Sequence, residues 1–169
     1  MSINFIFPLV LFICSCSPYK ISEGEILTNK VMCDFSKKMK LKNLQPAGIG
    51  GGIDHETGKH NKLKIVFDIE KLPDINYARK IIVETIDEFL HEINNRVEVR
   101  DLLSRYPFTL KNIEIAIINV RDREGLKCVY NQGNELNYYK SNPDPNNLQS
   151  MDVHSETYEE AVRILSSQT

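Results

Sequence analysis

The chain has 169 residues, of which 41% are hydrophobic and 26% are charged, a balance typical of an ordinary globular domain. Its formal net charge is -2 at pH 7 and its isoelectric point is about 6.1, so it lacks the basic surface that most nucleic-acid-binding domains carry. The composition therefore predicts one folded domain, excludes a disordered or repetitive chain, and argues against a nucleic-acid partner.

The first fifteen residues have the pattern of a signal peptide. An apolar run extends from Ile3 to Ile13 and is interrupted only by Asn4. This run is too short to cross a bilayer, which needs about 20 helical residues, but it is typical of the apolar core of a secretion signal. No lysine or arginine precedes the run, which departs from the usual signal pattern. We expect residues 1–15 to be removed on export.

The next residues carry a more specific motif. Ile13-Cys14-Ser15-Cys16 resembles the lipobox of bacterial lipoproteins, with a branched aliphatic residue three positions before the cysteine and a small residue directly before it. The resemblance implies that Cys16 is acylated and anchors the chain in the cell envelope, with residues 16–24 as a tether. Ser17 favours the outer membrane by the same resemblance. Export without a lipid and a short buried strand in a cytosolic protein are the alternatives.

Residues 25–169 show the periodicities of a single α+β domain. Apolar residues recur every three to four positions in predicted helices at residues 25–41, 75–95 and 155–165. They alternate with polar residues in a predicted strand at 63–69, and further strands are expected at 113–120, 126–130 and 135–140. The second helix has the clearest start, because Asp74 follows Pro73 and can cap it. This order predicts a small, mostly antiparallel sheet of three or four strands with the helices packed on one face.

The first predicted helix ends in a lysine-rich segment that contains Lys37, Lys38, Lys40 and Lys42. Cations at the C-terminal end of a helix interact favourably with the helix dipole. We therefore interpret this segment as a solvated helix end, with contact to anionic phospholipid below the tether as the alternative.

A glycine-rich stretch, GIGGGIDHETGKH at residues 48–60, lies between this helix and the first predicted strand. A dinucleotide-binding motif needs a third glycine where this chain has Ile53, and a helix where this chain continues into a strand. A phosphate-binding P-loop fails at the same residue and again at His60, where a serine or threonine must contact magnesium. The stretch is therefore predicted to be a flexible connection, and no cofactor is expected.

The same stretch contains the strongest candidate for a metal site. Asp54, His55 and His60 are residue types that bind zinc, but the two histidines are one position too far apart for the helical HExxH motif. A loop can still gather ligands irregularly. A small metal-dependent hydrolase that uses these three residues is therefore an alternative function.

Two further cysteines follow the predicted acylation site. Cys33 and Cys128 either form one disulfide, which an oxidising compartment permits, or remain two buried free thiols. Nothing in the sequence sets their separation in space, so both outcomes stay open.

Several segments resemble a family of uncharacterised small exported proteins and lipoproteins of intracellular bacteria. They are the glycine-rich stretch, residues 63–69, the long helix from Ala78 to Asn95, the segment RYPFTLKNIEI at 105–115, and residues 154–165. The resemblance covers residues 40–165. It implies the fold and the exported location, but it brings no activity, substrate or catalytic residue.

The leading hypothesis is a membrane-anchored, non-enzymatic domain of the cell envelope that binds an envelope or host protein. Two aromatic segments, Tyr106-Pro107-Phe108 and Tyr138-Tyr139, are the predicted contact surfaces. Burial of Phe108, Tyr138 and Tyr139 together would exclude this placement. No catalytic residue is predicted, and a secreted effector without a lipid anchor is the second alternative.

Overall fold

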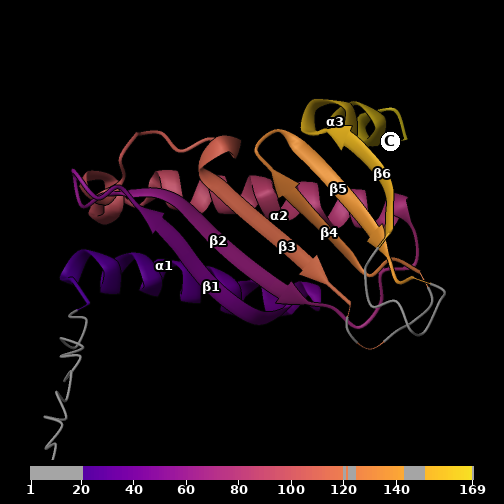
Figure 1. Ribbon diagram of the computed structural model, residues 1–169, viewed down its shortest axis with the longest axis horizontal. Coiled ribbons are helices and arrows are strands. Elements are labelled where there is room, and N and C mark those ends of the chain that lie inside the picture. Colours follow the sequence, from indigo (N-terminus) through magenta and orange to yellow (C-terminus); the bar gives the residue numbers. More distant parts are fainter. Residues whose placement is uncertain (1–20, 120, 122–124, 143–150, 169) are drawn as a thin grey trace, which may run out of the picture.

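The computed structural model describes residues 21–119, 121, 125–142 and 151–168. Within them the chain forms one six-stranded sheet whose spatial order follows the sequence (Figure 1). The strands are β1 Gln45–Ile53, β2 His60–Asp68, β3 Ile113–Ile118, β4 Cys128–Gln132, β5 Glu135–Lys140 and β6 Met151–Thr157. The α-helices are α1 Glu23–Met39, α2 Ile75–Asn95 and α3 Tyr158–Ser166, and short 3-10 helices cover Lys40–Lys42, Val97–Leu102 and Leu110–Asn112. The predicted signal peptide and acylation site Cys16 lie outside the described residues.

The α+β class is confirmed, but the sheet has six strands instead of the predicted three or four. The two additional strands are its edges, β1 and β6. β1 is the glycine-rich stretch, which pairs antiparallel with β2 along nearly its whole length and is therefore not a flexible connection. β6 takes up residues directly before the last helix and pairs with β5. The predicted hairpin partners β3 and β4 pair as expected.

Strands β2 and β3 form the one parallel pair among the described strands, and helix α2 connects them. A parallel pair needs such a crossover, because the chain must return to the same end of the sheet. The helix begins at the predicted residue because the Asp74 carboxylate accepts the backbone N–H of Tyr77 at 2.8 Å. This cap fixes where the first turn of α2 meets the sheet.

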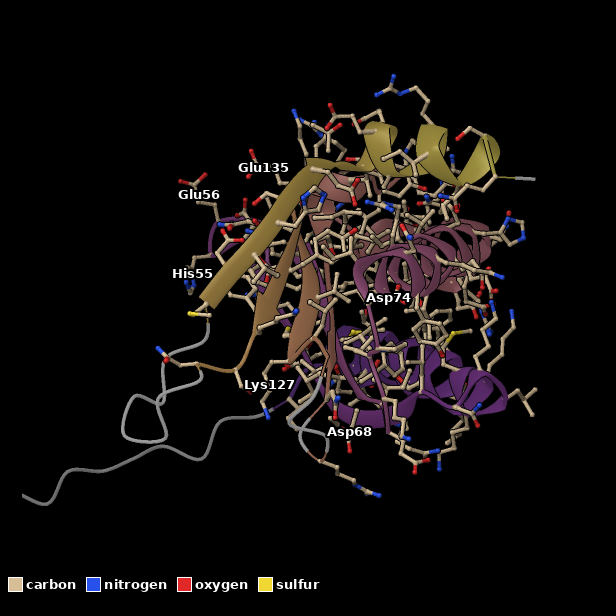
Figure 2. All side chains as sticks on the ribbon, turned by 90° about the vertical axis from the view of Figure 1, so that its right-hand side faces the viewer. His55, Glu56, Asp68, Asp74, Lys127 and Glu135 are labelled. Atoms are coloured by element: carbon tan, nitrogen blue, oxygen red, sulfur yellow. The ribbon has the colours of Figure 1, made fainter. Side chains whose placement is uncertain are left out.

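The three α-helices lie on one side of the sheet (Figure 2). Side chains of β2 alternate accordingly, with Leu63, Ile65 and Phe67 fully buried under the helices. Lys62 and Lys64 point to the opposite, open face, where Lys62 donates to the Glu114 carboxylate of β3 at 2.8 Å. No α-helix among the described residues is long and apolar enough to cross a membrane.

The lysine-rich end of α1 is held against α2. Lys42 donates to the carboxylates of Glu84 and Glu88 at 3.1 and 2.5 Å, and Lys38 lies 3.6 Å from Glu88. The hydrogen bond to Glu88, together with the nearby Glu84, raises the pKa of Lys42, although partial burial acts in the opposite direction. Lys38 and Lys42 therefore help dock α1 on α2 and do not belong to a merely solvated helix end.

Candidate functional site

A cavity of about 610 Å³ opens between the start of α2, the end of β5 and strand β6. We call it the Arg79 cavity. Asp74, labelled in Figure 2, marks the start of α2 beside it. The described residues that line the Arg79 cavity are Pro73, Asp74, Ile75, Asn76, Arg79, Leu126, Lys140, Val153 and His154.

A buried ion pair lies beside the Arg79 cavity, and of its two members Arg79 lines the cavity. Arg79 of α2 and Glu156 of β6 are only 6% and 8% exposed. The Arg79 Nε donates to both carboxylate oxygens of Glu156, at 2.8 and 3.1 Å, and its Nη1 donates to the Asn76 side-chain oxygen at 2.6 Å. Desolvating two charges costs several kcal/mol each, so such a pair persists only when hydrogen bonds satisfy it this fully. The pair joins the first turns of α2 to the edge of the sheet.

Two aromatic groups complete this network. The Tyr138 hydroxyl donates to Glu156 at 2.5 Å, and burial together with this hydrogen bond raises the pKa of Tyr138 above its usual value. The ring of His154 lies 5.4 Å from the Tyr138 ring, centroid to centroid. Its Nε2 is 3.7 Å from the Glu156 carboxylate, beyond hydrogen-bond length, and has no hydrogen-bond partner among the described residues.

The cavity is suited to an anionic group. Arg79, Lys140 and His154 contribute cationic or donor groups. The first N–H groups of α2 have no partner within the helix and carry the positive end of its dipole. Asp74 is the one acid among the described residues of the wall, and its carboxylate is engaged in the helix cap. The described lining contains no serine, threonine or cysteine, so these residues offer no nucleophile of those types.

Comparisons with protein-family models, curated proteins and solved structures gave no match. The resemblance to small exported proteins of intracellular bacteria stays a prediction.

The three residues predicted as metal ligands are not gathered into a metal site. Asp54 opens the turn after β1, where its carboxylate accepts the N–H groups of Glu56 and Thr57 at 2.9 and 3.0 Å, and these bonds lower the pKa of Asp54. His55 is exposed and points away from the helices (Figure 2), whereas His60 is buried at the start of β2. No group of three or more His, Cys, Asp or Glu in the described ranges could hold a metal ion. The geometry gives the metal-dependent hydrolase no support.

Cys33 and Cys128 are free thiols, so of the two alternatives left open by the sequence the disulfide is not formed, and Cys33 is exposed instead of buried. Cys33 is exposed on α1, on the covered side of the sheet. Cys128 adjoins the buried Val129 in β4 and therefore points to the open face. Burial, opposed only in part by Lys127, raises the pKa of Cys128 to about 11. Such a thiol is a poor nucleophile at neutral pH.

The predicted aromatic contact surfaces are only partly accessible. Phe108 and Tyr138 are 2% and 0% exposed, so both belong to the core, and their placement in a contact surface is wrong. Tyr106 is 41% exposed, although its hydroxyl donates to a backbone carbonyl of α2 and a guanidinium group lies over its ring. Tyr139 is half-buried on the open face, where it stacks on Tyr130 with ring centroids 5.7 Å apart.

Arg79 and Glu156, at the centre of this network, were not predicted as site residues from the sequence. Arg79 follows Ile75 by four positions and precedes Ile82 by three, so it occupies the apolar stripe of its helix. A charged residue in an apolar stripe needs a buried partner, and this was the signal that could have identified Arg79. Its partner Glu156 could not be found in this way, because the residue fell inside a predicted helix.

Proposed function

We propose that the chain is a lipid-anchored envelope protein whose folded part is a non-enzymatic binding domain, and that the Arg79 cavity is its ligand site. The ligand is a carboxylate or phosphate group, which belongs either to a small molecule or to a partner molecule. The proposal combines the lipobox at Cys16 with the cavity, because a tethered domain with a rigid polar cavity is suited to capture at a membrane surface.

The observation that carries the proposal is the orientation of Arg79. Its guanidinium is held on two sides by Glu156 and Asn76, while the side chain still contributes to the cavity wall. A charged group that is fixed before the ligand arrives loses little side-chain entropy on binding. Lys140 and His154 line the same cavity and supply a second cation and an unpartnered nitrogen.

Ligand binding is tested by titrating the purified protein with acetate and with inorganic phosphate while the backbone amide signals of Ile75 and Asn76 are followed by NMR. Saturable shifts are expected with at least one anion and not with methylammonium. Lys140→Gln should lower the affinity for the anion about five-fold, because it removes one solvated charge contact worth about 1 kcal/mol. Lys111→Gln is the matched control, since Lys111 is exposed outside the cavity. Equal effects of the two substitutions would refute the site.

The anchor is tested separately by incorporation of radiolabelled palmitate into the wild-type chain and the Cys16→Ala variant. Label in the wild type alone supports the lipid anchor. Absence of label in both, with the protein recovered outside the cells, supports instead the secreted form without a lipid. Neither result alters the ligand test, so anchor and cavity can fail independently.

A further inference from the structure

A second cavity lies beneath the glycine-rich strand, on the opposite edge of the sheet from the Arg79 cavity. It has a volume of about 210 Å³ and separates the first turns of α1 from β1. We call it the His60 cavity. Its walls are Glu25, Asn29 and Met32 of α1, Ile49, Gly50, Gly51 and Ile53 of β1, and His60 of β2.

A glycine in β1 keeps the His60 cavity open. A Cβ atom at Gly51 would point toward the helix side, 3.6 Å from the Leu63 side chain and 3.7 Å from the His60 Nδ1. The same atom would lie 2.7 Å from the carbonyl oxygen of Lys62, closer than real Cβ contacts allow. Any side chain at this position would therefore enter the space between β1 and the His60 ring. The glycine-rich composition leaves room under the strand without breaking its pairing with β2.

His60 is a buried polar residue without a partner. It is 6% exposed, and its Nδ1 is inaccessible to solvent and forms no hydrogen bond with the described residues. Burial lowers the pKa of His60, although the nearby Glu25 acts in the opposite direction, so the ring is neutral at pH 7. A neutral imidazole has one nitrogen that accepts a hydrogen bond. A buried polar atom without a hydrogen-bond partner is unfavourable, and a donor in the cavity would relieve this.

The polar groups of the cavity favour a cation over an anion. Glu25 contributes a carboxylate, Asn29 an amide oxygen, and His60 a neutral ring, whereas the described residues that line the cavity include no lysine or arginine. Met32, Ile49 and Ile53 supply an apolar floor beside these acceptors. A bare metal ion would need more ligands than one carboxylate and one imidazole, and the described residues contain no group of three. An ammonium group with a short hydrocarbon chain satisfies both the acceptors and the apolar wall.

We propose that the His60 cavity binds a small aliphatic amine, with the ammonium group at Glu25, Asn29 and His60 and the hydrocarbon chain against Met32, Ile49 and Ile53. The site is independent of the Arg79 cavity, since the two cavities have no lining residue in common within the described ranges and select opposite charges.

The test uses the full chain and three probes of nearly equal size: n-butylammonium, n-butanol and n-butyrate. Binding is followed by isothermal titration calorimetry and by the NMR signals of the Gly50 and Gly51 amides. n-Butylammonium is expected to bind saturably and to shift these signals, n-butanol more weakly, and n-butyrate not at all. Similar binding of all three probes, or no saturable shift with the amine, would overturn the proposal.

Matched variants assign the charge contact. Glu25→Gln should lower the affinity for n-butylammonium about ten-fold or more, as expected for loss of a hydrogen bond to a charged acceptor. Glu23→Gln removes the same charge from the same helix turn but lies outside the cavity and should leave binding unchanged. Asn29→Leu fills the cavity from α1 and should abolish binding, with the melting temperature as the control for folding. Equal weakening by the Glu25 and Glu23 substitutions would show a non-specific charge effect and refute the site.

Discussion

The buried Arg79–Glu156 pair provides the sharpest test of the fold around the candidate site. In Arg79→Met the Glu156 carboxylate, whose side chain is 5% exposed, keeps the Tyr138 hydroxyl and loses both hydrogen bonds from the guanidinium. Removing one partner of a buried ion pair costs about 3–5 kcal/mol, because the remaining charge is left desolvated and uncompensated. Glu156→Leu should cost a similar amount, since it leaves the Arg79 charge buried.

The double variant Arg79→Met/Glu156→Leu separates the cost of an orphaned charge from the net value of the pair. Because both charges are removed together, its loss of unfolding free energy should be well below the sum of the two single losses. Tyr138→Phe should cost about 1.5–3 kcal/mol, since it removes a hydrogen bond to a charged acceptor. Urea unfolding followed by circular dichroism measures all four variants. Single losses below about 1 kcal/mol, or additive losses in the double variant, would refute the buried-pair argument.

Three further predictions concern other parts of the chain. Gly125→Ala should destabilise the fold far more than Gly133→Ala in urea unfolding; both glycines have positive φ, but only at Gly125 would a Cβ lie 2.4 Å from a backbone oxygen. Burial lowers the pKa of His60, so below about pH 6.5 the unfolded chain binds more protons than the folded chain. The free energy of unfolding should therefore decrease as the pH is lowered from 7.5 to 5.5, and it should decrease less in His60→Gln. In thiol labelling at pH 8, Cys33→Ser should remove a fast phase and Cys128→Ser a slow one, since Cys33 is the exposed one of the two cysteines that the structure describes; equal rates would contradict this.

The central elements could be predicted because their buried faces are apolar. Helix α2 begins and ends at the predicted residues, with Asp74 as its cap and Ile82, Ile86 and Phe89 buried toward the sheet. Strand β2 shows strict alternation around Ile65. In such segments the periodicity of burial and the periodicity of hydrophobicity coincide, so a sequence pattern is sufficient.

The two edge strands were missed for different physical reasons. β1 contains four glycines and little side-chain surface, so its own propensity for strand is low, and it forms because β2 offers a regular partner. β6 does have alternating burial, but its inward positions are His154 and Glu156, which a hydrophobicity pattern counts as exposed. The site was missed with the strand, because Glu156 could be recognised as the partner of Arg79 only after β6 was placed beside β5.

The buried polar residues Thr85, Asn131, Arg79, Glu156 and His60 fall into two groups that differ in what satisfies them. Thr85 donates to a backbone carbonyl of its own helix, and Asn131 bonds the backbone of β3 through both its oxygen and its nitrogen, so each completes local main-chain hydrogen bonding. Arg79 and Glu156 instead satisfy each other across two elements, and the His60 Nδ1 is not satisfied within the described residues. Main-chain bonding explains the first group as structure alone. The second group carries a desolvation cost that local structure does not require, and Arg79 and His60 each line a cavity. That coincidence of an unexplained polar burial with an adjacent cavity is the reason to assign ligand sites there and not at the exposed histidine and acids of the β1–β2 turn.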